Sequence, residues 1–201
     1  MQHLIRFDDY TKDDVYEIFQ IADEIKDGKY QNFLEGKTVI LFFPNSSIRT
    51  RVAFEKGIHL LGGQTIWFPP EALDKREKLE DVIRYLNNWA DAAVIRHKNI
   101  AILDEIAQYA SFPVINALTD ENHPCEILSD LYALSKLRNN FCTDKFLFVG
   151  AKGNIGGAWQ EAAQVMGFEL AQCCPKGYEL DGVEVIRDLK EAVRGRDIIC
   201  T

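Results

Sequence analysis

The sequence of 201 residues lacks a long apolar run, and no segment approaches the length that spans a bilayer. It also lacks a tract of lysine and arginine, and its formal net charge is -8. These features argue against a membrane protein and against broad binding to nucleic acid, whose phosphates attract basic surfaces. The segment Met1 to Asp9 has no cationic start followed by an apolar centre, so it does not predict a secretory signal.

Cysteine is scarce and irregularly spaced. The cysteines are Cys125, Cys142, Cys173, Cys174 and Cys200. Their number is odd, their spacing does not suit a metal site, and adjacent cysteines rarely pair with each other. We therefore expect free thiols in a reducing, cytoplasmic protein. Since 47% of the residues are hydrophobic, the chain can form one large core or two small ones.

Short apolar strands alternate with amphipathic helices along the chain. The expected strands are 38–43, 64–68, 92–96, 113–117, 145–149, 169–173 and 197–200. The expected helices are 12–26, which Thr11 caps, a helix from Ser46 or Ser47 to Gly62, 79–89, 100–109, 126–137, a helix after Gly157, and 189–194. We expect the apolar residues at helical spacing on the first two helices to face a core; they are Val15, Ile18, Phe19, Ala22 and Ile25 on the first, and Val52, Phe54, Ile58 and Leu61 on the second. This alternation predicts an α/β protein with two parallel-sheet αβα domains. We place the domains at residues 1–138 and 139–201, and we expect the second to be incomplete because its last strand has no covering helix.

The polar segment after strand 38–43 is the first candidate site. Ser46 or Ser47 can cap the next helix, whose free N–H groups and positive end favour a phosphate. Arg49 and Arg51 add guanidiniums that can hold oxygens in a bidentate way. A capped helix with two solvated arginines would show the same local pattern, so both interpretations stay open.

Polar residues also follow other strands, and the carboxyl ends of parallel strands share one edge of a sheet. The three loops contain Ser47, Arg49 and Thr50; Arg96 and His97; and Asn122, His123 and Glu126. We expect these loops to converge on a site for a phosphate and a carbonyl group.

Glycines three residues apart follow strand 145–149, at Gly150, Gly153 and Gly156, and Glu169 lies further along the chain. This pattern weakly resembles a dinucleotide fingerprint and leaves a nicotinamide-binding oxidoreductase open. Close packing of the next helix on the strand explains the same glycines, and Glu169 can simply be exposed.

Three motifs resemble those of the aspartate and ornithine carbamoyltransferases. Ser47-Ile48-Arg49-Thr50-Arg51 resembles the family's S-T-R-T-R phosphate loop, and Val94-Ile95-Arg96-His97 resembles its strand-end arginine. His123-Pro124-Cys125-Glu126 is similar to its H-P-C-Q segment. The resemblance covers essentially the whole chain. It is closest to the ornithine type, because Asn154 matches an asparagine of those enzymes.

The resemblance implies transfer of the carbamoyl group of carbamoyl phosphate to the amine of an amino acid, most closely ornithine, without a metal or cofactor. It implies that Ser47, Arg49, Thr50 and the backbone of Ile48 hold the phosphate. Thr50, Arg96 and His123 would polarise the carbonyl oxygen, and Arg49 and Arg96 would stabilise the charge of the leaving phosphate. Glu126 would face the carbamoyl amide and Asn154 the amino acid.

The resemblance also implies a homotrimer with active sites at the subunit interfaces. The loop Leu73 to Glu77 would then bring Lys75 or Arg76 to a neighbouring subunit's site, although its composition alone favours a solvated surface loop. Two departures from the family pattern, Ile48 for threonine and Glu126 for glutamine, favour the alternative of a catalytically silent homologue that binds a phospho-anion. The amine-selecting motifs of the family would lie beyond Thr201.

Overall fold

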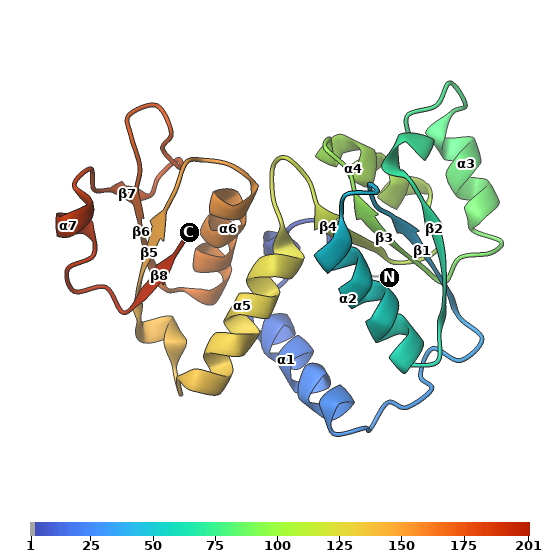
Figure 1. Cartoon of the computed structure of the whole chain (residues 1–201), viewed down its shortest axis with the longest axis horizontal. Coiled ribbons are helices and arrows are strands. Elements are labelled where there is room, and N and C mark those ends of the chain that lie inside the picture. The colour runs from blue at the N-terminus through green and yellow to red at the C-terminus, as the bar shows by residue number, and fades with distance from the viewer. Residues whose placement is uncertain (1–2) are drawn as a thin grey trace. The chain divides into compact units, whose positions relative to one another are not determined.

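The computed structural model describes residues 3–201, and within them the chain forms two compact units, each with a four-stranded parallel sheet (Figure 1). The first unit comprises the chain up to Ile5 together with Tyr16–Asp120. The second comprises Arg6–Val15 and Glu121–Thr201. The predicted α/β class with two parallel sheets is confirmed.

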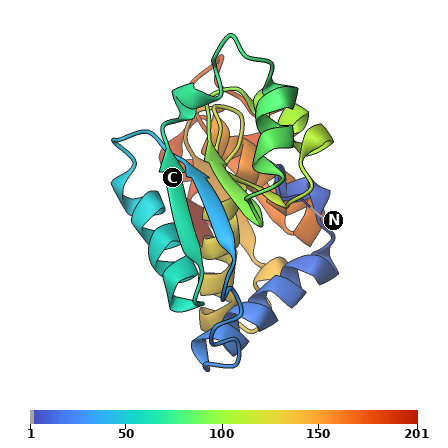
Figure 2. The same ribbon diagram turned by 90° about the vertical axis from the view of Figure 1, so that its right-hand side faces the viewer.

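The sheet of the first unit has the order β2-β1-β3-β4. Its strands are β1 (Thr38–Phe42), β2 (Gln64–Phe68), β3 (Ala92–Arg96) and β4 (Val114–Leu118). The strands β1 and β2 lie side by side in Figure 2 and start in register at Thr38 and Gln64. Since all four strands are parallel, their carboxyl ends lie along one edge of the sheet.

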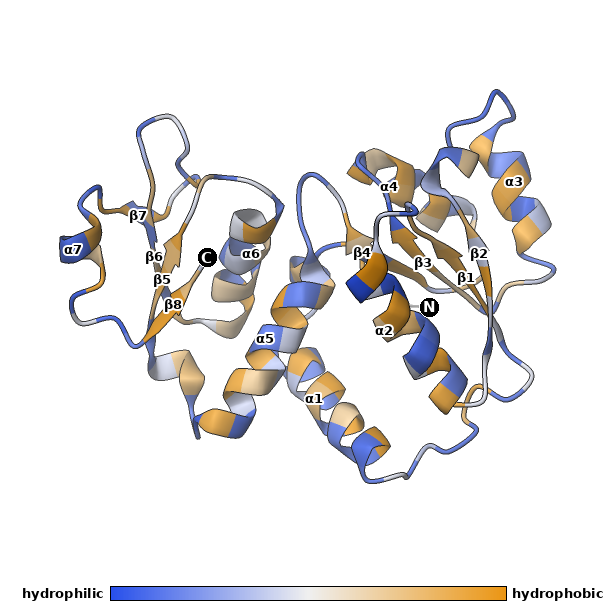
Figure 3. Cartoon of the chain, viewed as in Figure 1, coloured by the Kyte–Doolittle hydropathy of each residue, from blue (hydrophilic) through white to orange (hydrophobic). Residues whose placement is uncertain are grey.

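Helices cover both faces of this sheet. They are α2 (Ile48–Leu60), α3 (Leu79–Leu86) and α4 (Ile100–Tyr109). Ile40 and Phe42 pack with residues of α3 and α4, whereas Val39 and Leu41 pack with Ile58 of α2. The central strands β1 and β3 are therefore apolar on both sides, and they are mostly orange in Figure 3, whereas the edge strand β2 is paler.

The N-terminal helix α1 (Lys12–Lys26) begins and ends where the sequence predicts. The Thr11 hydroxyl accepts a hydrogen bond from the Asp14 N–H at 3.2 Å, and the Asp14 carboxylate accepts one from the Thr11 N–H at 2.8 Å. This reciprocal pair confirms the predicted cap. The predicted buried face is correct for Val15 and Phe19 but wrong for Ile25, which is 39% exposed.

Two other helix predictions need correction. Helix α3 ends at Leu86, whereas the sequence predicts its end at residue 89. The helix stops because the Asn87 side chain donates a hydrogen bond to the Tyr109 carbonyl and accepts one from the Ser111 N–H, just after α4. On α2, Val52 is 57% exposed although its spacing predicts a core position. The buried face of that helix runs through Phe54 and Ile58.

The sheet of the second unit has the order β7-β6-β5-β8. Its strands are β5 (Lys145–Val149), β6 (Glu169–Cys173), β7 (Glu184–Val185) and β8 (Ile198–Cys200), and its helices are α5 (Pro124–Leu137), α6 (Asn154–Met166) and α7 (Leu189–Ala192). Three short 3₁₀ helices, η1 (Phe7–Asp9), η2 (Pro70–Ala72) and η3 (Phe141–Thr143), complete the elements of residues 3–201. The two-residue strand β7 was not predicted.

The compact second unit includes α5, whereas the sequence places α5 in the first domain. Compact units need not coincide with functional domains. The predicted domain boundary after residue 138 therefore stays a prediction. None of the helices within residues 3–201 has both the length and the apolar character needed to cross a bilayer.

Candidate functional site

The loop between β1 and α2 places Ser47 at the N-cap position of α2, as predicted. Its side chain makes no cap hydrogen bond, which corrects the expected use of the hydroxyl. Ser47 is 5% exposed, and its Oγ accepts a hydrogen bond from Nη1 of Arg96 at 3.2 Å. The hydroxyl therefore orients an arginine, and the N–H groups of the first helical turn keep their capacity to bind an anion.

The two arginines of this helix have different surroundings. The guanidinium of Arg51 is 2.8 Å from the carboxylate of Glu55 and lies 4.5 Å from the ring centre of Trp67. The Trp67 ring is itself fixed, because its N–H donates to the Phe43 carbonyl at 2.9 Å. Arg51 is thus held against the sheet by an ion pair and a cation–π contact, so Arg49 is the more available of the two arginines, and the phosphate contact expected of Arg51 stays a prediction.

Arg49 is exposed, and within residues 3–201 its side chain makes no ion pair or hydrogen bond. Thr50, the next residue of the first turn, is half-buried. Ile48 is 72% exposed and begins the helix, so its apolar side chain points away from the core while its backbone stays in the first turn.

The end of β3 carries Arg96 at a local irregularity. The pairing of β3 with β4 shifts register between Ile95 and Arg96. Such a bulge changes the direction in which a side chain points. Arg96 lines a cavity of about 440 Å³ in the first unit, together with residues from the ends of β1, β3 and β4. Of the three predicted loops, the one with Arg96 and His97 lines this cavity, and Arg96 also reaches Ser47 of the first loop. The third loop, with Asn122, His123 and Glu126, belongs to the second unit, so convergence of all three stays a prediction.

His97 has a structural role that the sequence did not show. The ring is buried, its Nε2 lies 3.1 Å from the Asp74 carboxylate, and its Nδ1 lies 3.1 Å from the Asn99 N–H. These bonds connect the end of β3 to the loop that carries Lys75 and Arg76. Both of those residues are exposed, and neither has an ion pair with another part of the chain between residues 3 and 201.

His123 occupies the N-cap position of α5, followed by Pro124 at the first helical position. The ring is 4% exposed, and its Nε2 lies 3.1 Å from Oε2 of Glu126, whose side chain is 53% exposed. A carboxylate can only accept a hydrogen bond, so this pair favours the form of His123 with a proton on Nε2. Burial, with a smaller contribution from the charge of Glu126, raises the pKa of Cys125 to about 12, which makes this thiol a poor nucleophile.

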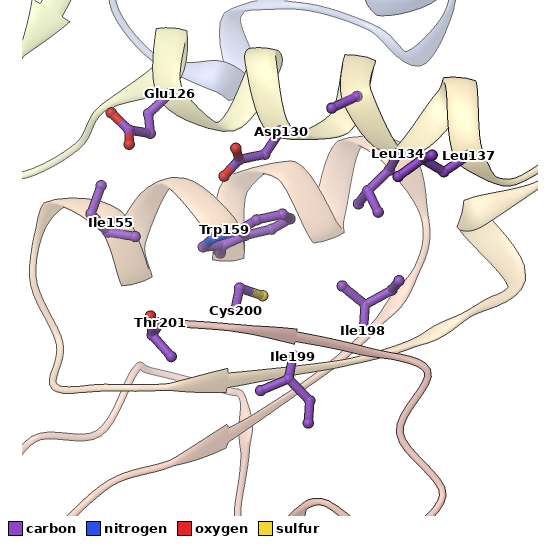
Figure 4. A pocket seen from close by; sticks show the side chains of 11 residues that line it. Glu126, Asp130, Leu134, Leu137, Ile155, Trp159, Ile198, Ile199, Cys200 and Thr201 are labelled. Atoms are coloured by element: carbon purple, nitrogen blue, oxygen red, sulfur yellow. The ribbon is translucent and has the colours of Figure 1, made fainter. Parts of the chain in front are cut away.

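A second cavity, of about 380 Å³, lies among α5, α6 and β8 (Figure 4). Glu126 and Asp130 point into it from α5, and Trp159 and Cys200 line it from α6 and β8. Burial, followed by the charge of Glu126, raises the pKa of Asp130 above its ordinary value. No sequence motif gives Asp130 a role, although its i, i+4 spacing from Glu126 places both carboxylates on one helix face.

Packing explains two of the three glycines that resemble a dinucleotide fingerprint, Gly150 and Gly156, but not Gly153, where a Cβ would lie 4.0 Å from the nearest atom, the Ala151 carbonyl oxygen. A Cβ at Gly150 or Gly156 would lie 2.7 or 2.8 Å from the Phe148 ring. Glu169 is exposed and forms an ion pair with Arg196 at 2.7 Å. Asn154 is the first residue of α6, and its Oδ1 accepts a hydrogen bond from the next N–H at 2.8 Å.

Comparisons with known proteins identify the family. Residues 2–136 match the family model described as the carbamoyl-P binding domain of aspartate/ornithine carbamoyltransferase. An ornithine carbamoyltransferase of Geobacter metallireducens is 36% identical over an alignment of 219 residues, which covers all of this chain and 72% of that protein. The chain belongs to the aspartate/ornithine carbamoyltransferase family.

Solved structures agree with this carbamoyltransferase assignment. The ornithine carbamoyltransferase of Burkholderia thailandensis superposes with a TM-score of 0.91 at 28% identity, over 99% of this chain and 74% of that one. The enzyme of Pyrococcus furiosus gives a TM-score of 0.90 at 29% identity, over 98% and 70% of the two chains. The predicted family and its enzymatic class, carbamoyl transfer, are confirmed, while the roles of individual site residues stay predictions.

Proposed function

We propose that this carbamoyltransferase transfers the carbamoyl group of carbamoyl phosphate to the side-chain amine of ornithine and releases phosphate. The observation that best supports the proposal is the hydrogen bond between Ser47 and Arg96, which brings a guanidinium to the N-terminus of α2. A helix N-terminus with nearby arginines suits a phosphate dianion. The names of the relatives support ornithine as the acceptor.

In the proposed reaction the neutral amine nitrogen attacks the carbonyl carbon of carbamoyl phosphate. The C=O electron pair moves onto oxygen to give a tetrahedral oxyanion, which Arg96, Thr50 and His123 stabilise. The oxyanion then collapses, the bond from carbon to the bridging oxygen breaks, and phosphate leaves with that electron pair. The nitrogen loses one proton, which the leaving phosphate accepts. Because charge moves from the carbonyl oxygen to the phosphate, fixed positive groups provide the main stabilisation of the transition state.

Each predicted site residue has a role in this proposal. Ser47, Arg49, Thr50 and the Ile48 N–H bind the phosphate, and Glu126 faces the carbamoyl amide. Asn154 contacts the amino acid. Lys75 or Arg76 reaches the site of a neighbouring subunit in a homotrimer, which their exposure and lack of partners along residues 3–201 support. We further propose that the protein works in the cytoplasm and in arginine metabolism, with no metal or cofactor.

The test is phosphate release from carbamoyl phosphate in the presence of single amino acids. We expect release with ornithine and much slower release with aspartate or lysine at equal concentration. A protein that binds carbamoyl phosphate but releases phosphate with none of them would instead be the silent homologue. The Nε2 of His123 lies within hydrogen-bond distance of the Glu126 carboxylate, at 3.1 Å, and this contact partly satisfies the extra carboxylate, which favours turnover over that alternative.

A further inference from the structure

Helix α6 contacts the loop before His123 through two residues on one face, Gly157 and Glu161. They are four positions apart, so their Cα atoms lie one above the other on the helix. At Gly157, a Cβ would lie 2.8 Å from the carbonyl oxygen of Glu121. The helix and the loop can therefore approach this closely only because residue 157 has no side chain.

One turn further, Glu161 connects two separate segments. Its Oε2 accepts a hydrogen bond from the backbone N–H of Phe7 at 2.8 Å, and its Oε1 lies 3.3 Å from Nδ2 of Asn122. Phe7 and Asn122 are each 1% exposed. The carboxylate thus acts as a double acceptor for buried donors, and without it these donors would lose a hydrogen bond that water cannot readily replace.

Burying the charged carboxylate of Glu161 costs desolvation free energy. Burial raises the pKa of the Glu161 carboxyl above its ordinary value, and the charge of Asp8 adds to this effect. The Phe7 N–H, Asn122 and Arg6 act in the opposite direction. An apolar residue would pack α6 against its neighbours without this desolvation, so packing alone does not explain a glutamate at this position.

The two residues that α6 holds, Glu121 and Asn122, come directly before His123. We propose that Gly157 and Glu161 are positioning residues, which fix the loop 121–122 and thereby the ring of His123 at the start of α5. This inference rests on the proposed role of His123 at the carbonyl oxygen. The two contacts are independent, because one is steric and the other is a hydrogen bond.

Two variants of the full protein test the proposal from different directions. Glu161→Gln keeps the size of the side chain but replaces one acceptor oxygen with a donor, and Gly157→Ala adds the Cβ that the loop cannot accommodate. The matched controls are Glu169→Gln, which removes an exposed carboxylate of the same unit, and Gly57→Ala, where a Cβ would meet nothing within 4 Å.

The first readout is the pair of ring nitrogen signals of His123 in a nitrogen-15 spectrum, assigned with the variant His123→Asn. The sequence has four histidines, so the spectrum is simple. We expect both test variants to shift the His123 signals and both controls to leave them in place. The second readout is turnover with carbamoyl phosphate and ornithine. Misplacing a group that acts in the transition state lowers kcat, here on the order of tenfold or more, with little change in KM.

Unshifted His123 signals in both test variants would overturn the proposal, because this readout needs no turnover. The proposal would also be overturned if the loss of activity in the test variants were fully explained by a smaller fraction of folded protein. Failure of the proposed function looks different. In that case His123→Asn would retain full turnover, or the parent protein would release no phosphate, while the spectra would still show whether α6 positions the ring.

Discussion

Nη1 of Arg96 donates a hydrogen bond to Oγ of Ser47 at 3.2 Å, across 49 positions of sequence. This bond joins the end of β3 to the start of α2. The partners lie on rigid elements, so the guanidinium is oriented before any anion arrives. Such preorganisation avoids the cost of ordering a flexible arginine during binding or catalysis.

Removing the Ser47 hydroxyl should lower both the stability of the first unit and the phosphate affinity of its site. For Ser47→Ala we expect the free energy of unfolding to fall by about 0.5–1.5 kcal/mol, the usual net value of one hydrogen bond. Phosphate binding should weaken as well. Denaturant unfolding and calorimetry measure the two effects, with the exposed Ser46→Ala as the matched control. Equal behaviour of the two variants would argue against the role of the Ser47 hydroxyl.

Replacing the carboxylate beside His123 should favour anion binding. Glu126→Gln removes a negative charge near the proposed phosphate, so near neutral pH we expect carbamoyl phosphate to bind more tightly by about 1–3 kcal/mol. The hydrogen-bond contact with Nε2 of His123 already stabilises part of this charge, which favours the lower end of that range. Calorimetry at several pH values measures the change. Weaker binding of the variant across that range would mean that Glu126 itself contacts the ligand.

The acid sensitivity of the first unit should depend on Asp91. This carboxylate accepts hydrogen bonds from Nζ of Lys37 and from the Thr38 N–H, each at 2.9 Å, and these bonds lower its pKa below the ordinary value. The stabilisation that the ionised Asp91 gives the folded state is therefore present above the unfolded-state pKa, and it is lost as the pH falls through the lower, folded-state pKa. Asp91→Asn should unfold more easily near neutral pH and lose less stability on acidification. Thermal melts of both proteins from about pH 7 to pH 3 test this, and parallel pH curves would contradict it.

The family resemblance predicts that the exposed loop with Lys75 and Arg76 acts in trans. We expect a trimer by light scattering at micromolar concentration. A mixture of inactive Arg49→Ala and inactive Lys75→Ala subunits should regain part of the activity, because some mixed sites receive both native residues. A monomer, or no recovery after subunit exchange has been demonstrated, would contradict the shared site.

Most strands could be predicted from sequence, and the reasons are local. The bounds of β2, β3, β5 and β6 match because each is a short apolar run with helical or turn segments on both sides. The strand β7 has two residues in a polar stretch and pairs with β6, so only the tertiary structure reveals it.

The side-chain partners of the site were less predictable. The i, i+4 spacing of Arg51 and Glu55 was visible in the sequence, but the stacking of Arg51 on Trp67 depends on the position of β2 beside α2. Glu161 gave no local signal either, since its partners Phe7 and Asn122 are distant in sequence. Long-range contacts of this kind decide which polar residues remain available to a ligand.

Comparing Arg49→Ala with Arg51→Ala by phosphate calorimetry tests most directly whether the N-terminus of α2 is a phosphate site. Each variant loses one arginine of the same helix, but only Arg51 is engaged with Glu55 and Trp67. We predict that Arg49→Ala weakens binding by about 1.5–3 kcal/mol, the range for hydrogen bonds to charged groups. Arg51→Ala should mainly reduce stability. Unchanged phosphate affinity in Arg49→Ala would contradict the site.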